Sequence, residues 1–79
     1  MIVQASLAVY PLGQQNFDAV HRAIEALDAA HVTVTRGAMN TTIVGNEPEV
    51  FAALRAAFSA AAKLGGTVLT VTVSNACPL

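Results

Sequence analysis

The chain has 79 residues, of which 54% are hydrophobic and only 11% are charged, and its net charge is -1 at pH 7. Soluble domains usually carry roughly 25% charged residues, and a domain this short is only marginally stable alone. We therefore expect one domain, residues 1–79, that associates with further copies. The basic residues form no stripe that could neutralise phosphates, which argues against a nucleic-acid partner: Arg22, Arg36, Arg55 and Lys63.

The cysteine count and the apolar runs limit where the protein works. Cys77 is the single cysteine, so an intramolecular disulfide is excluded. No apolar run is long enough to span a bilayer, and the apolar start lacks the basic region of a signal peptide. We therefore expect a cytoplasmic protein that does not insert into a membrane.

The first half of the chain reads as strand, helix and strand. Residues 2–10 alternate apolar and polar positions, which predicts a half-buried strand that ends at Pro11 and Gly13. Asn16 is a candidate N-cap for a helix that runs to about Ala30. Spacings of three and four predict its buried stripe: Phe17, Val20, Ile24 and Leu27. Residues 31–35 are rich in β-branched side chains and form the next predicted strand.

The second half repeats this order. Residues 39–45 predict an interior strand without charge, and residues 47–64 predict a helix with proline near its start and glycines after its end. The predicted buried stripe of that helix follows the same spacings: Val50, Phe51, Leu54, Phe58 and Ala61. Residues 67–74 alternate again and predict the last strand.

The order βαββαβ is typical of the ferredoxin-like fold, an α+β fold with a four-stranded antiparallel sheet and two helices on one face. Right-handed crossovers place the first and third strands in the middle. The sheet face away from the helices carries no charge, and we predict that a second copy covers it or the strand edges, giving a dimer or tetramer. A Thr-rich face in contact with water is the alternative. The residues of this face are Gln4, Ser6, Ala8, Tyr10, Val68, Thr70, Thr72 and Ser74.

Few residues could carry chemistry. His21 and His31 have no second ligand at a motif spacing, so we expect no metal site and no cofactor. Cys77 lacks a nearby His or acidic partner in sequence, which favours a buried or tail thiol over a nucleophile. The acidic residues fall at helix surfaces or ends, which leaves no carboxylate pair for acid–base catalysis. We therefore expect a protein that is not an enzyme.

Neutral hydrogen-bonding side chains, in contrast, are frequent along the predicted strands and at their ends. Hydroxyls and amides both donate and accept, so such a set can read a heteroaromatic ring with ring nitrogens beside an amino group. Threonine is also simply a common strand residue, and this alternative stays open. The set is Ser6, Tyr10, Asn40, Thr41, Thr42, Thr70, Thr72, Ser74 and Asn75.

Three short motifs, in order along nearly the whole chain, resemble the thiamine and hydroxymethylpyrimidine-binding protein family. They are Tyr10-Pro11-Leu12, the run Met39-x-Thr41-x-Ile43-x-Gly45 leading into Pro48-Glu49-Val50-Phe51, and Thr72-x-Ser74-x-x-Cys77-Pro78. The chain looks like one half of the family's tandem form. The resemblance implies a ferredoxin-like subunit, assembly through its sheets, and binding of thiamine or its pyrimidine moiety without chemistry upon it, for uptake or salvage of thiamine precursors.

The resemblance also suggests a site. Tyr10 would stack on or close over the ring, while Thr41, Ser74 and Asn75 would read its polar edge, with Ser6 and Asn40 as further candidates. The tandem form carries an acidic residue where this chain has residues 36–38, which favours the neutral hydroxymethylpyrimidine over the thiamine cation. The competing hypothesis is a small oligomeric scaffold or regulatory module without a small-molecule ligand.

Overall fold

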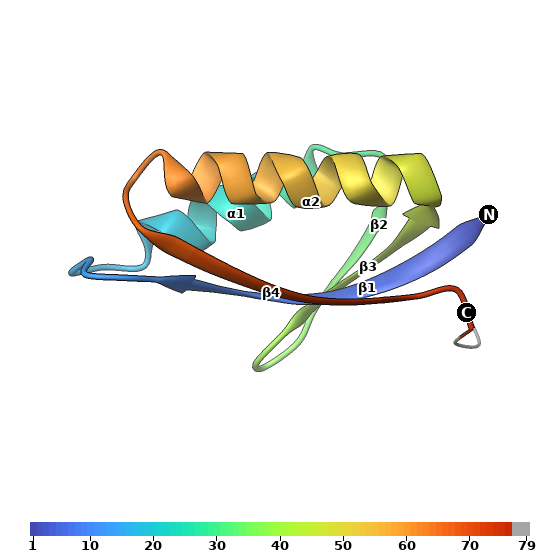
Figure 1. Cartoon of the computed structure of the whole chain (residues 1–79), viewed down its shortest axis with the longest axis horizontal. Coiled ribbons are helices and arrows are strands. Elements are labelled where there is room, and N and C mark those ends of the chain that lie inside the picture. The colour runs from blue at the N-terminus through green and yellow to red at the C-terminus, as the bar shows by residue number, and fades with distance from the viewer. Residues whose placement is uncertain (77–79) are drawn as a thin grey trace.

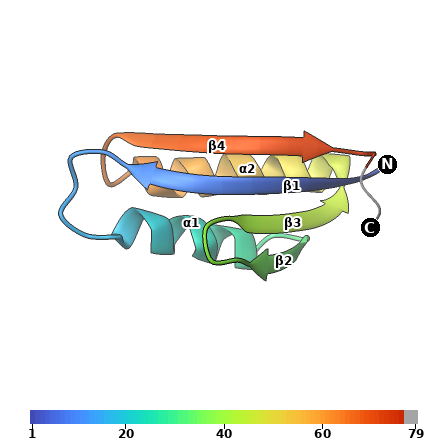
Figure 2. The same cartoon turned by 90° about the horizontal axis from the view of Figure 1, so that it is seen from below.

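A computed structural model describes residues 1–76 of the chain. The strands lie in the order β2-β3-β1-β4, and every neighbouring pair is antiparallel. Both helices cover one face of this sheet (Figure 1), and the other face is open (Figure 2). The predicted ferredoxin-like fold is thereby confirmed, with its elements in the order β1 (Ile2–Pro11), α1 (Asp18–Asp28), β2 (Thr33–Arg36), β3 (Thr41–Asn46), α2 (Glu47–Ala62) and β4 (Thr67–Ser74).

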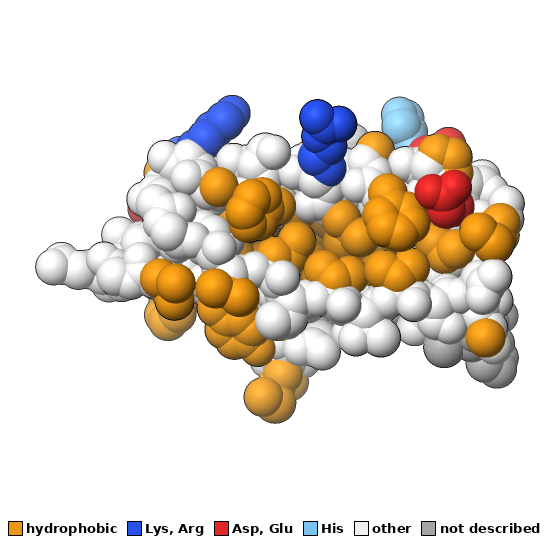
Figure 3. Space-filling model, in the orientation of Figure 1, with side chains coloured by type: hydrophobic (Ala, Val, Ile, Leu, Met, Phe, Trp, Pro, Cys, Tyr) orange, Lys and Arg blue, Asp and Glu red, His pale blue; other side chains and the backbone are white. Residues whose placement is uncertain are grey.

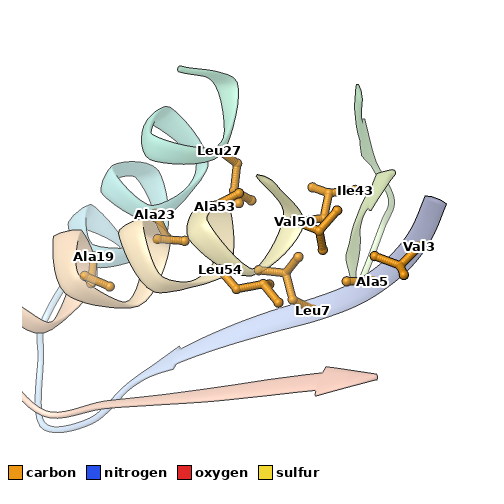
Figure 4. Close-up of a cluster of buried hydrophobic side chains, with 12 residues drawn as sticks. Val3, Ala5, Leu7, Ala19, Ala23, Leu27, Ile43, Val50, Ala53 and Leu54 are labelled. Carbon is orange, nitrogen blue, oxygen red and sulfur yellow. The ribbon is translucent and has the colours of Figure 1, made fainter. Parts of the chain in front are cut away.

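The core lies between the sheet and the helices and is built largely from small side chains. Every second residue of β1 faces the helices, as the alternation predicted. Alanines supply much of the helix surface that meets the sheet, which lets the helices approach closely. Figure 4 shows most of this cluster, whose members are Val3, Ala5, Leu7, Ala19, Ala23, Leu27, Ile43, Val50, Ala53, Leu54, Ala57 and Ala61.

The predicted buried stripes were wrong for the aromatic residues. The side chain of Phe17 is 70% exposed, and those of Phe51 and Phe58 are 47% and 42% exposed. The helices instead turn their alanines inward, such as Ala19 and Ala57. Both helices carry apolar residues on two sides, so hydrophobic spacing alone could not decide which side meets the sheet.

Three boundaries also differ from the prediction. Met39 is 88% exposed and, with Asn40, belongs to the turn between β2 and β3, which the Gly37 N–H closes by donating to the Asn40 carbonyl at 2.8 Å. Asn16 accepts a hydrogen bond from the Asp18 N–H at 3.0 Å through its side chain, but the N-cap position of α1 is Phe17. The predicted strand over 31–35 lies at Thr33–Arg36.

A hydrogen bond at each end of β1 shows toward which neighbouring strand the backbone N–H and C=O groups of its residues point. The Leu12 N–H donates to the Gly66 carbonyl, and the Glu47 N–H donates to the Met1 carbonyl, each at 2.9 Å. In an antiparallel ladder, the N–H and C=O of one residue face the same neighbouring strand, and the direction alternates residue by residue. The backbone groups of even-numbered residues of β1 therefore face β4, and those of odd-numbered residues face the β3 side.

Two further predictions from the sequence concern Cys77 and insertion into a membrane. Cys77, predicted to be a buried or tail thiol and not a nucleophile, lies outside the described residues. Within residues 1–76, no helix has both the length and the apolar character needed to cross a membrane.

Candidate functional site

Strand β1 continues past the end of β3, and this overhang creates a notch in the sheet. The pairing of β1 with β3 stops at Leu7 and Thr41, whereas its pairing with β4 continues to Pro11. Val9 is odd-numbered, so its backbone N–H and C=O point into the notch, where none of the strands of residues 1–76 pairs with them. A hollow of about 190 Å³ opens at this place, between β1, α1 and the β2–β3 turn.

The hollow is neutral and has one apolar wall. Helix α1 supplies aliphatic side chains, including the fully buried Ala23 and the nearly buried Leu27. Asn40, Thr41 and Tyr10 add an amide and two hydroxyl-bearing side chains. Within the described part of the chain, no Asp, Glu, Lys, Arg or His lines the hollow. Such a site suits an uncharged, partly apolar molecule with a polar edge.

Four of the six predicted site residues lie at or beside this notch. Tyr10, Asn40 and Thr41 line it, and Thr41 stands opposite Leu7, so both face the helix side of the sheet. Ser6 lies on the open face of the sheet, where its Oγ accepts a hydrogen bond from Asn40 Nδ2 at 3.1 Å. Ser6 thus holds the amide of Asn40 and does not line the hollow itself.

Ser74 and Asn75 lie at the other end of the sheet. Ser74 pairs with Gln4, six residues along β1 from Tyr10, which is roughly 20 Å at the usual rise per strand residue. Ser74 Oγ accepts a hydrogen bond from the Ala76 N–H at 3.0 Å, and Asn75 Nδ2 donates to Met1 Sδ at 3.3 Å. A single chain therefore does not bring these two residues to the notch, and their role in binding stays a prediction.

A second hollow, of about 400 Å³, adjoins the first. The two share Val9, Tyr10 and Val20, and the second extends over the connection between β1 and α1. Gln14 is fixed there, because its Nε2 donates to the Gly66 carbonyl at 3.0 Å. The side chain of Phe17 forms part of the same surface. Together the hollows give a ligand more room than the notch alone.

The sequence interpretation missed the backbone of Val9. No side-chain type signals a hydrogen-bonding backbone pair, since every residue except proline carries one. The usable signal was strand length: the first predicted strand covers residues 2–10, whereas its predicted neighbour covers only 39–45. A longer strand beside a shorter one leaves part of its edge free, and that part can bind a ligand.

A family model described as the YKOF-related family matches residues 2–79. The match extends over almost the whole length of the sequence. The chain therefore belongs to the YKOF-related family. No curated protein has significant sequence similarity to the chain.

Solved structures repeat the fold. A hypothetical protein from Methanocaldococcus jannaschii superposes with a TM-score of 0.86 at 25% identity, over 94% of this chain and 79% of that one. A protein from Streptococcus pneumoniae gives 0.87 at 22% identity, over 94% and 86%. A Thermotoga maritima protein, described as a "putative thiamine biosynthesis/salvage protein", gives 0.80 at 21% identity, over 92% and 82%. The last two likenesses establish the fold alone.

Proposed function

We propose that the protein binds the hydroxymethylpyrimidine moiety of thiamine without chemistry upon it, for uptake or salvage of thiamine precursors. The observation that carries the proposal is the unpaired backbone of Val9 in a neutral hollow. An aminopyrimidine presents a ring nitrogen, which accepts a hydrogen bond, beside an amino group, which donates one. The N–H and C=O of one strand residue offer the complementary donor and acceptor side by side.

The size and lining of the notch favour the pyrimidine over the whole of thiamine. A hollow of about 190 Å³ is smaller than the roughly 300–1,000 Å³ of pockets for drug-sized ligands, so a single ring suits it. The adjoining hollow has room for a second ring, but its lining within residues 1–76 includes no carboxylate to pair with a thiazolium. Asn40 and Thr41 can hydrogen-bond the hydroxymethyl group.

The comparisons add independent support for a link to thiamine. One structural neighbour is described in terms of thiamine biosynthesis or salvage, although at 21% identity it shares only the fold. The same fold recurs in proteins of other organisms. The ligand of this chain therefore has to be established on the chain itself.

Titration calorimetry with hydroxymethylpyrimidine and with thiamine tests the proposal. We expect the pyrimidine to bind more tightly, and Thr41→Val to weaken its affinity about fivefold, the effect of losing one hydrogen bond of about 1 kcal/mol. Thr33→Val is the matched control, because Thr33 is an exposed threonine of β2 outside the notch. No heat at millimolar concentrations of either ligand, with folded protein, would falsify the proposal.

The second candidate function is an oligomeric scaffold or regulatory module without a ligand. The exposed aromatic side chains of α2 favour it, since they give the chain a surface suited to association. Under this hypothesis, Thr41→Ala and Ser74→Ala change stability only. The calorimetric comparison of wild type and Thr41→Val distinguishes the two functions.

A further inference from the structure

The side chain of Asn40 is held in one orientation at the edge of the notch. Its Nδ2 donates to Ser6 Oγ at 3.1 Å, and its backbone carbonyl accepts from the Gly37 N–H at 2.8 Å. The turn that carries Asn40 is therefore fixed both by its own backbone and by a bond across the sheet to β1. Ser6 is half-buried, whereas Asn40 is exposed and accessible to a ligand.

The bond to Ser6 decides which atom of the Asn40 amide can meet a ligand. The amide nitrogen and oxygen branch from one planar carbon, so Oδ1 points away from Ser6 when Nδ2 points toward it. Ser6 lies outside the lining of the hollow, whereas Ala8, the next residue of β1 on the same sheet face, lies within it. Within residues 1–76, no hydrogen bond occupies Oδ1. The amide thus presents a free acceptor to the hollow.

The surroundings of this oxygen are unfavourable for an anion. Helix α1 ends at Asp28, directly after Leu27 of the hollow's wall, and its last turn contains no basic residue. The C-terminal end of a helix carries a partial negative charge. Arg36, the basic residue next to the β2–β3 turn, is ion-paired with Asp28. Figure 3 shows the visible Lys and Arg side chains over the helices, away from the open face of the sheet.

Substituents on a pyrimidine differ in what they offer to such an acceptor. A hydroxymethyl O–H donates to Oδ1 and can accept from the hydroxyl of Thr41. A phosphate monoester carries a charge of about -1.5 to -2 at pH 7 and offers mainly acceptor oxygens. Against Oδ1 it would place negative charge beside a carbonyl oxygen, and such a charge is costly to desolvate without a partner.

We propose that Ser6 makes the notch selective for the free hydroxymethyl group over its phosphate ester by holding the Asn40 amide with its oxygen toward the ligand. Asn40 is the specificity-determining residue, and Ser6 is a positioning residue that does not touch the ligand. This selectivity rests on the proposed function, since it concerns the same ligand at the same notch. A ligand whose hydroxyl receives a phosphoryl group would leave the site, so the protein binds the compound that a phosphoryl-transfer reaction consumes.

Titration calorimetry with hydroxymethylpyrimidine, its phosphate monoester and its 5-methyl analogue tests the selectivity. We expect the wild type to bind the alcohol about tenfold more tightly than either of the other two, because both leave Oδ1 without a donor. Equal affinity for the alcohol and the ester overturns the selectivity and leaves the proposed function standing. No heat with any of the three ligands overturns both.

Variants of β1 test the role of Ser6. Ser6→Ala releases the amide, which can then turn Nδ2 toward the phosphate, so we expect the ratio of the alcohol and ester affinities to fall about fivefold. Ser6→Thr retains the hydroxyl and should keep the ratio of the wild type. Gln4→Ala is the matched control, because Gln4 is half-buried on the same face of β1, two residues further from the notch. A ratio that Ser6→Ala leaves unchanged, or that Ser6→Thr or Gln4→Ala lowers equally, overturns this role.

Asn40→Asp tests the orientation of the amide. A carboxylate offers only acceptors, and it accepts a hydrogen bond from an alcohol more strongly than a neutral amide does. We expect the variant to bind the alcohol about threefold more tightly than the wild type and to give no heat with the ester. Loss of alcohol binding in the folded variant, with folding checked by circular dichroism, would show that the amide N–H meets the ligand and would contradict the proposal.

Discussion

Two of the free stretches of edge in the described sheet, the overhang of β1 and the outer side of β4, differ in length and surroundings. At Val9, one residue of β1 presents its backbone in a notch walled by α1 and the β2–β3 turn. Along β4, four alternate residues point their backbone N–H and C=O groups away from β1, on the free side of the strand: Thr67, Leu69, Val71 and Val73. The notch exposes the backbone of one residue and is closed by neighbouring elements, so we expect it to bind a small ring and not another strand. The β4 edge is long and flat enough for another strand. We therefore expect the same kind of unpaired backbone group to bind different partners according to what surrounds it.

The largest expected effect on stability distinguishes residues of β1 whose backbone N–H faces β4 from residues whose backbone N–H faces the notch. The Ala8 N–H faces β4, so Ala8→Pro removes a ladder bond of a central strand and should cost about 3 kcal/mol of unfolding free energy. The Val9 N–H faces the notch, so Val9→Pro should cost about 1 kcal/mol while weakening pyrimidine binding about tenfold. Urea denaturation measures the unfolding free energy of both variants, and calorimetry measures their affinity for the pyrimidine. Equal destabilisation by both variants would show that the alternation along β1 is misassigned.

The next effect concerns the floor of the notch. Leu27 is buried and lines the hollow, so Leu27→Ala should destabilise the protein by about 3 kcal/mol through lost burial and the cavity left behind. Phe17→Ala, at an exposed position of the same helix region, should change stability by less than about 0.5 kcal/mol. Thermal unfolding compares the two. A larger loss of stability in Phe17→Ala than in Leu27→Ala would instead support the buried stripe that the sequence predicts for α1.

The shape of the β2–β3 turn gives a smaller effect. A Cβ at Gly37 would stand 2.6 Å from the Asn40 carbonyl oxygen, so Gly37→Ala must displace the turn that carries Asn40 and Thr41. We expect a loss of about 1 kcal/mol in stability and a several-fold loss in pyrimidine affinity. Gly66→Ala is the control, because the nearest atom to its added Cβ would lie at 3.7 Å. Unchanged pyrimidine affinity in Gly37→Ala would show that the conformation of this turn does not contribute to binding.

The smallest expected effect is on the protected edge. Arg36→Gln removes the ion pair with Asp28, whose side chains are both well exposed. Exposed pairs contribute little, so we expect a change of at most about 0.5 kcal/mol in unfolding free energy. We also expect the oligomeric state to stay the same, because β2 is a short edge strand that ends at a charged residue and is therefore poorly suited to pair with another strand. Light scattering and urea denaturation check both results, and a change in mass would implicate β2 in assembly.

The fold could be predicted because its signals are local. The alternation over Thr67–Ser74 and the glycines before it fixed β4 to the residue, and the order of elements left few topologies. The buried side of α2 could not be predicted in the same way. Its phenylalanines are more hydrophobic than Ala53 or Ala57, but the close approach of helix and sheet favours the small residues inside.

The site was predictable only in part. The neutral side chains Tyr10, Asn40 and Thr41 were identified from residue type and resemblance, and they line one hollow. Val9 was not identified, because what it contributes depends on where the neighbouring strand stops. Ser74 and Asn75 were grouped with Tyr10 from their residue types, but position along paired strands places them at the opposite end. Residue type indicates which groups can bind, whereas strand register decides which of them meet.

Residue-resolved amide hydrogen exchange, with and without hydroxymethylpyrimidine, tests the contrast between the two edges most directly. We expect the Leu69 and Val71 amides to be protected without ligand, since the sequence predicts that a second copy covers the strand edges. The Val9 amide should exchange rapidly in the free protein and become protected as ligand saturates the notch. A Val9 amide that is unaffected by saturating ligand, or outward amides of β4 that exchange like an exposed edge, would contradict the account.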